Sequence, residues 1–167
     1  MLQKLFTAIT GHCKSVCILI GMVLSGCVGS TAPLDQYETE ANLTIEDNRT
    51  ACVERINALR ATLDLPPYER WEAGESCADD SAKNDALRDQ VQSSFRTCDE
   101  QAQNECNEWE TVDDVFDSCF QAMWDEGLGK EDANKSYENM AHESYTRVAC
   151  GFYVTKEGMI WSVQNFQ

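Results

Sequence analysis

Histidine, the side chain that most often transfers protons in catalysis and ligates transition metals, is scarce in this chain. The 167 residues contain two histidines, His12 and His142, together with nine cysteines. A Ser-His-acid triad in the folded region would depend on His142, whose neighbour Ser144 lies two residues away and would not face it on a helix. We therefore interpret His142 as a surface residue in a short loop or helical turn.

The cysteines are spaced for disulfides rather than for zinc. The chain has no Cys-x-x-Cys pair, and His142, the one histidine after residue 26, cannot complete the usual mixed ligand set of a zinc site. Six cysteines follow residue 27, and an even number in an exported chain favours three disulfides, whose pairing the sequence leaves open. They are Cys52, Cys77, Cys98, Cys106, Cys119 and Cys150. A catalytic cysteine would need a free thiol, which this interpretation does not leave.

Residues 1–26 have the features of a signal peptide. Lys4 and Lys14 are basic, no acidic residue is present, and residues 16–24 are predominantly apolar. That run is too short to span a bilayer, which takes about 20 residues, but it fits a secretory signal. It ends in Leu-Ser-Gly-Cys27, which resembles a bacterial lipobox. We predict that Cys27 is acylated; an ordinary signal peptide cleaved nearby is the alternative.

The rest of the chain predicts one domain behind a tether. Residues 27–45 hold the acylated cysteine and an acidic polar tether, and residues 46–167 have the length of one domain. Thirteen basic and 29 acidic residues give a net charge of −16, the wrong sign for contacts with nucleic-acid phosphates. We expect an exported protein at the bacterial cell envelope that reaches the membrane through its lipid and binds no nucleic acid.

Apolar periodicity predicts helices first and a hairpin last. The helices are expected at about 46–63, where Cys52, Ile56, Leu59 and Leu63 share a face, at about 74–95, and at about 112–125. Residues 145–155 and 159–166 are rich in aromatic and β-branched residues and flank a Gly158 turn, which predicts a β-hairpin. The fold class is therefore α+β, with helices packed on a small antiparallel sheet.

The order of short motifs resembles that of the CAP superfamily, which includes cysteine-rich secretory proteins, venom antigens and plant pathogenesis-related proteins. The resemblance covers about residues 47–166 and lies in segments 56–60, 65–71, 103–105, 123–126, 135–140, 145–151 and 161–166. It implies a three-layer α-β-α sandwich with a cleft.

The resemblance also implies where a metal site would lie. In many members two His and two Glu meet in the cleft and hold a divalent metal. The two Glu positions correspond to Glu105 and Glu126, whereas the His positions fall on Ser136 and about Gln92. Carboxylates without imidazole bind zinc poorly, and a calcium ion would need further oxygen ligands. We therefore expect a degenerate tetrad, no metal and no cofactor.

These observations favour a binding or interaction module without catalytic activity, whose partner is an unknown protein or a small hydrophobic ligand. One alternative is a hydrolase, carboxylate-based or metal-dependent, that uses Glu105 and Glu126 in the cleft, in the first case as acid and base. The other is a sterol- or fatty-acid-binding protein with a pocket lined by Phe120, Met123, Met140 and Phe152, for which packing in the core is the competing interpretation.

Overall fold

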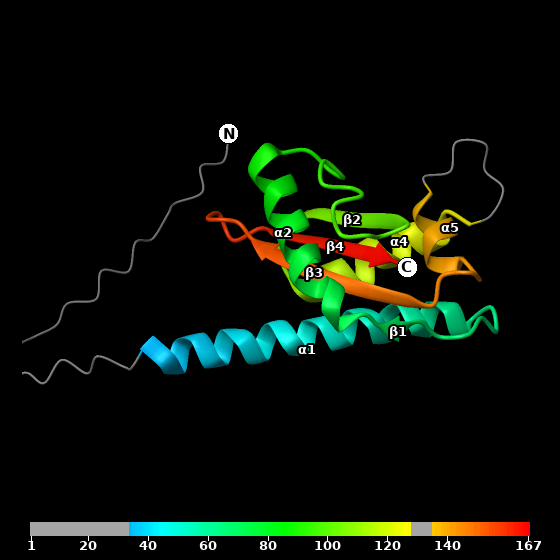
Figure 1. The fold of residues 1–167 in the computed structure, drawn as a ribbon, viewed down its shortest axis with the longest axis horizontal. Coiled ribbons are helices and arrows are strands. Elements are labelled where there is room, and N and C mark those ends of the chain that lie inside the picture. The colour runs from blue at the N-terminus through cyan, green and yellow to red at the C-terminus, as the bar shows by residue number, and fades with distance from the viewer. Residues whose placement is uncertain (1–33, 128–134) are drawn as a thin grey trace, which may run out of the picture. The chain divides into compact units, whose positions relative to one another are not determined.

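The computed structural model describes residues 34–127 and 135–167, with side chains from residue 46 onward. Its elements are α1 (Leu34–Ala61), β1 (Glu69–Arg70), α2 (Glu72–Arg88), β2 (Ala102–Trp109), α3 (Val112–Asp114), the π-helical turn η1 (Val115–Cys119), α4 (Phe120–Asp125), α5 (Ser136–Ala141), β3 (Arg147–Val154) and β4 (Ile160–Phe166) (Figure 1). The expected signal peptide and Cys27 lie outside the described residues. In the described part, no helix has the length and apolar character needed to cross a membrane.

The four strands form one sheet in the order β1-β3-β4-β2. β3 and β4 pair antiparallel, which confirms the predicted hairpin, and β2 pairs antiparallel with the other edge of β4. β1 adds two residues parallel to β3. Every residue of β4 is buried because this strand has neighbours on both sides and helices over both faces.

Helices cover both faces of the sheet. Side chains point alternately to opposite faces of a strand, so β4 contributes Trp161 and Val163 to one side and Ile160 and Phe166 to the other. The first pair packs against alanines of α2, and the second belongs to a larger core with α1, η1, α4 and α5. The predicted α+β class and three-layer α-β-α sandwich are confirmed.

α2 lies unusually close to the sheet at Gly151. A Cβ atom at this position would overlap the backbone of Ala78 and Asp79, so the helix can approach β3 only because residue 151 is glycine. The carboxylate of Asp79 accepts a hydrogen bond of 2.8 Å from the backbone N–H of Phe152. The contact fixes α2, and therefore the loop that follows it, relative to the sheet.

All six predicted cysteines form disulfides, which confirms the framework and supplies the pairing. The bonds are Cys52–Cys150, Cys77–Cys98 and Cys106–Cys119. They join α1 to β3, α2 to the loop before β2, and β2 to η1.

Several boundaries differ from those predicted. α1 begins at Leu34, within the segment expected as a tether, and ends at Ala61, which leaves Leu63 48% exposed beyond it rather than on the apolar face. α2 ends at Arg88 instead of continuing to about residue 95, because Asp89 adopts the left-handed conformation that terminates helices.

β2, the strand that carries Glu105, was not predicted. The sequence Ala-Gln-Asn-Glu-Cys-Asn-Glu-Trp is polar and lacks β-branched residues, so its intrinsic strand propensity is low. It is nevertheless a strand because the edge of β4 supplies partners for its backbone. The short β1 and α5 were also not predicted.

Candidate functional site

The site begins with the 89–101 loop, which connects α2 to β2. Four of its residues other than glycine have positive φ angles, namely Asp89, Gln92, Arg96 and Asp99. Such conformations are individually unfavourable and persist when surrounding contacts determine them. The loop therefore requires strong attachment to the body of the domain.

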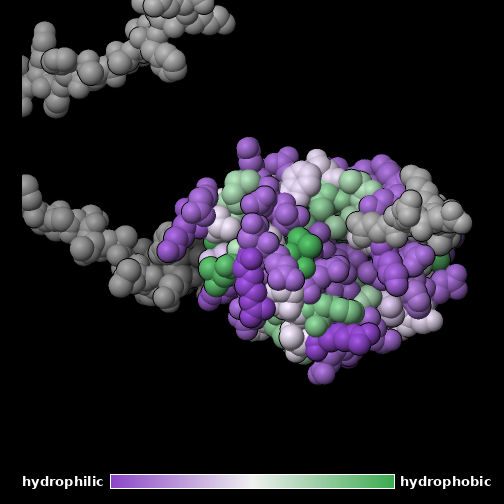
Figure 2. Space-filling model, turned by 90° about the horizontal axis from the view of Figure 1, so that it is seen from above, coloured by the Kyte–Doolittle hydropathy of each residue, from purple (hydrophilic) through white to green (hydrophobic). Residues whose placement is uncertain are grey.

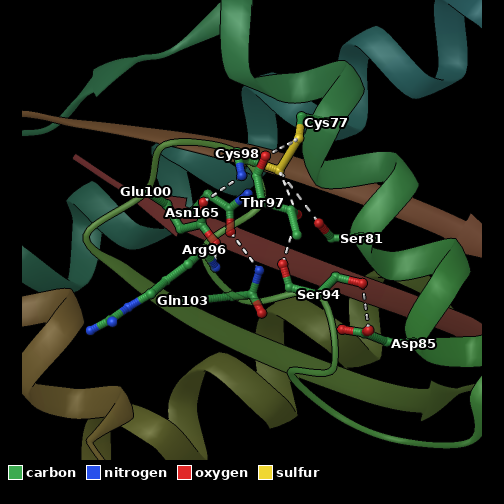
Figure 3. The surroundings of a disulfide bond; sticks show 10 residues. All are labelled: Cys77, Ser81, Asp85, Ser94, Arg96, Thr97, Cys98, Glu100, Gln103 and Asn165. Carbon is green, nitrogen blue, oxygen red and sulfur yellow. Dashed lines mark hydrogen bonds between the residues drawn. A yellow bond between two sulfur atoms is a disulfide. The ribbon is translucent and has the colours of Figure 1, made fainter.

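Buried carboxylates and a disulfide supply that attachment (Figure 3). Cys98 is bonded to Cys77 of α2. The backbone N–H groups of Cys98, at 2.8 Å, and of Arg96 both donate to the buried carboxylate of Glu100. Earlier in the loop, the hydroxyls of two consecutive serines donate to Asp85 of α2, which is fully buried.

β2 also contacts this loop, through Glu105 and the Gln103 carbonyl. Oε2 of Glu105 accepts a hydrogen bond of 2.5 Å from the backbone N–H of Gln92, and the side-chain amide of Gln92 donates to the carbonyl of Gln103 at 3.0 Å. The structure thus brings together Glu105 and Gln92, two of the four residues that the resemblance assigned to the cleft. In this arrangement Gln92 is a structural residue of the loop.

Asp85 is the partner of Glu105 that sequence reasoning missed. Burial raises the pKa of Glu105 to about 8, the Gln92 N–H opposes this in part, and the nearby Asp85 raises it further. Asp85 Oδ2 and Glu105 Oε1 are both enclosed and have no hydrogen-bond partner within the described residues, so a protonated Glu105 avoids placing two charged carboxylates together. The sequence signal was present: Asp85 follows Ala78 and Ala82 at helical spacing, on the buried face of α2.

The other two assigned residues are Ser136 and Glu126. Ser136 begins α5, and its carbonyl accepts a hydrogen bond of 2.9 Å from the side chain of Asn104. Asn104 points to the opposite face of β2 from Glu105, since neighbouring residues of a strand alternate. Glu126 follows α4 and is partly buried, with its Oε2 enclosed. Within the described residues, no hydrogen bond or charge interaction joins it to Glu105.

These residues do not fit the divalent metal that the fold family implies. Across residues 46–127 and 135–167, no group of three or more His, Cys, Asp or Glu side chains is arranged to hold a metal ion. One oxygen of Glu105 already accepts an N–H bond, and the group next to it is a buried carboxyl rather than an imidazole. The donor set is therefore one for protons and backbone amides.

A cavity of about 360 Å³ lies beside this loop. Its walls come from the 89–101 loop, the start of β2, α5 and the residues on either side of α5, and they combine polar and charged side chains with three rings. The lining residues are Gln92, Phe95, Arg96, Gln101, Ala102, Gln103, Lys135, Glu138, Asn139, His142 and Tyr145. Gln92 is the one residue shared with the four assigned by resemblance. The cavity is thus next to the predicted cleft position, with a largely different set of side chains.

His142 is exposed, as predicted, and it also lines the cavity. Its ring stacks on Tyr145 with centroids 4.0 Å apart. Its Nδ1 accepts from the backbone N–H of Ser144 at 3.2 Å, so this nitrogen cannot donate to an orienting carboxylate as it does in a triad. The ring therefore serves as a planar wall.

The wall that carries His142 is tied to α1 by a buried arginine. Arg60 has no exposed surface and donates to the carbonyls of Met140, at 2.7 Å, and His142, at 3.1 Å. Its guanidinium lies 3.6 Å from the ring centre of Tyr68, whose hydroxyl donates to the same His142 carbonyl at 2.8 Å. Burial raises the pKa of Tyr68 to about 12, so this hydroxyl keeps its proton.

The apolar residues considered as a lipid pocket belong to the core. Phe120, Met123 and Met140 are each at most 7% exposed and pack in the main cluster. Phe152 is partly buried and packs edge-to-face against Phe116. Core packing is therefore the correct interpretation of these side chains.

No family model matches the chain, and no curated protein matches it in sequence. Solved structures do. An outer surface protein of Borrelia burgdorferi is 12% identical with a TM-score of 0.54, over 72% of this chain and 91% of that one. The pathogenesis-related protein MpPR-1i is 14% identical with a TM-score of 0.53, over 80% and 92%. Venom allergen-like protein 4 of Schistosoma mansoni is 15% identical with a TM-score of 0.48, over 72% and 89%.

The neighbours are structures of the CAP superfamily, and the two with the higher TM-scores share the sandwich described above. The resemblance found in the short motifs is therefore confirmed at the level of the fold: this chain has the CAP fold.

Proposed function

We propose that the protein is a CAP-fold binding module, held at a bacterial cell envelope by a lipid on Cys27, and that it binds its ligand without catalysing a reaction. The lipobox-like sequence before Cys27 and the three disulfides support export. A structural neighbour with the same fold is an outer surface protein, which is consistent with this location.

The observation that carries the non-catalytic part is the state of the carboxyl groups. A general acid or base must reach the substrate. Asp85 has no exposed surface, Glu105 has one oxygen buried and the other bonded to the Gln92 N–H, and an oxygen of Glu126 is also buried. Asp85 and Glu105 therefore support the loop that forms the cavity wall rather than facing a substrate.

The cavity argues for a polar ligand rather than a sterol or fatty acid. Most of its lining side chains are amides or charged groups, whereas lipid-binding pockets are lined mainly by apolar residues. The face seen in Figure 2 is likewise mostly hydrophilic, with small, scattered apolar areas. The hydrophobic ligand expected from the sequence is not supported by this lining.

Detergent phase separation tests the anchor. The wild-type protein expressed in a bacterium should partition into the detergent phase and show the mass of an acylated chain that begins at Cys27. A Cys27→Ala variant should remain unprocessed or be cleaved elsewhere without the acyl mass, while Cys17→Ala, a change within the predicted signal, serves as the matched control. Recovery of the wild type in the aqueous phase without acyl mass would refute the anchor.

A further inference from the structure

The cavity concentrates positive charge in a strongly acidic protein. The chain carries −16 overall, yet Arg96 and Lys135 both line the cavity against a single carboxylate, Glu138. Elsewhere in the described residues the ion pairs use Arg49, Arg55 and Arg70. Neither Arg96 nor Lys135 takes part in an ion pair within that part of the chain. Two cationic groups are therefore left to face the cavity.

The neutral side chains of the cavity are largely occupied. The amide of Gln92 donates to the Gln103 carbonyl, that of Gln103 to Asn165, and that of Asn139 to Asn104. Each of these amides therefore gives at least one N–H to the protein. Among the donors that line the cavity, those of Arg96 and Lys135 carry a positive charge, which suits an anionic oxygen.

Flat rings form the other part of the wall. His142 lies parallel to Tyr145, with 17° between the ring planes. Phe95 is 37% exposed, a large apolar surface to leave in water, and the Arg96 guanidinium lies 5.3 Å from its ring centre. Rings placed beside a cation accommodate a planar group that carries a negative charge.

We infer that the cavity binds a small organic anion, with its anionic oxygens against Arg96 and Lys135 and its planar part against Phe95 and His142. The volume of about 360 Å³ suits a compound of one or two rings. This inference rests on the proposed binding function and gives it a ligand class. The 89–101 loop, pinned by Cys77–Cys98 and by the Asp85–Glu105 pair, presents Phe95 and Arg96 to the ligand.

Ligand-observed NMR with four simple probes tests the inference on the full acylated chain in detergent, with a chelator present. Benzoate has both ring and charge, benzamide the ring alone, acetate the charge alone, and benzylammonium the ring with the opposite charge. Benzoate should bind most tightly, by about tenfold over benzamide, which is the usual value of one charge-assisted contact. Arg96→Gln and Lys135→Gln should each weaken benzoate by a similar factor, and Lys156→Gln, which removes the same charge from the β3–β4 turn, should not.

Three results would overturn the anionic ligand class. Benzamide or benzylammonium could bind as tightly as benzoate or more tightly, no probe could bind, or the affinity for benzoate could be unchanged in both cavity variants. A second set of samples contains added zinc in place of the chelator. If the proposed metal-free binding function is wrong, benzoate would bind only in the zinc samples, because a metal would then hold the anion. Comparing the two sets therefore separates the ligand class from the proposed function.

Discussion

The Asp85–Glu105 pair makes the stability of the fold depend on pH in a specific direction. The pKa of Glu105 in the folded protein is about 8, against 4.5 for the free side chain. Below pH 4.5 Glu105 is protonated in both the folded and the unfolded protein, so it does not lower the free energy of unfolding. As the pH rises from 4.5 to 8, the unfolded chain releases the proton while the folded chain retains it, so the free energy of unfolding falls; above 8 it levels off.

The magnitude follows from the size of the shift. At about 1.4 kcal/mol per pKa unit, the shift corresponds to roughly 4–5 kcal/mol. Part of the Glu105 side chain reaches solvent, and screening there reduces the expected loss to about 2–3 kcal/mol. A Glu105→Gln variant should avoid this loss, because its amide stays neutral: the carbonyl can accept from Gln92 and the NH₂ can donate to Asp85.

Chemical denaturation with the disulfides intact, followed between pH 4.5 and 9, measures this effect. The free energy of unfolding of Glu105→Gln minus that of the wild type should rise with pH by about 2–3 kcal/mol. Glu110→Gln, an exposed change of the same charge just after β2, is the control and should give a flat difference. Parallel curves for wild type and Glu105→Gln over this range would refute the raised pKa of Glu105.

Two further perturbations test the supports of the site. Replacing Cys77 and Cys98 together by Ser should lower the free energy of unfolding by about 3 kcal/mol, since the bond closes a segment with a sequence separation of 21, and an unchanged denaturation midpoint would contradict this role. Gly151→Ala should cost more than about 3 kcal/mol or prevent folding, because its methyl group would overlap the α2 backbone; Ala149→Gly on the same strand should be milder, and an equal or smaller loss for Gly151→Ala would contradict the close approach.

The predictable part of the fold came from strong periodic patterns. The helix containing Cys52, Ile56 and Leu59 and the aromatic, β-branched hairpin around Gly158 have apolar patterns that match their burial. β2 could not be predicted in this way, because its residues have weak strand propensity and the strand exists through pairing with β4. The end of α2 was also missed, because Asp89 adopts a left-handed conformation that glycine or asparagine usually provides.

The candidate site was only partly predictable for a related reason. Sequence resemblance marked Gln92 and Glu105, and the structure joins them by a hydrogen bond. It did not mark Asp85, whose importance depends on a fully buried position beside Glu105. Nor did it mark Arg96 and Lys135, because they are distant in sequence and meet at one cavity only through the path of the 89–101 loop and the position of α5.

Calorimetric titration of the purified acylated chain with zinc, after treatment with a chelator, tests the central claim most directly. With one oxygen of Glu105 bonded to a backbone amide, and no group of three ligating side chains and no second imidazole in the described residues, zinc should bind no more tightly than to an ordinary acidic surface, with a dissociation constant on the order of millimolar. A single stoichiometric site with micromolar or tighter affinity, lost in Glu105→Gln, would contradict the metal-free binding module.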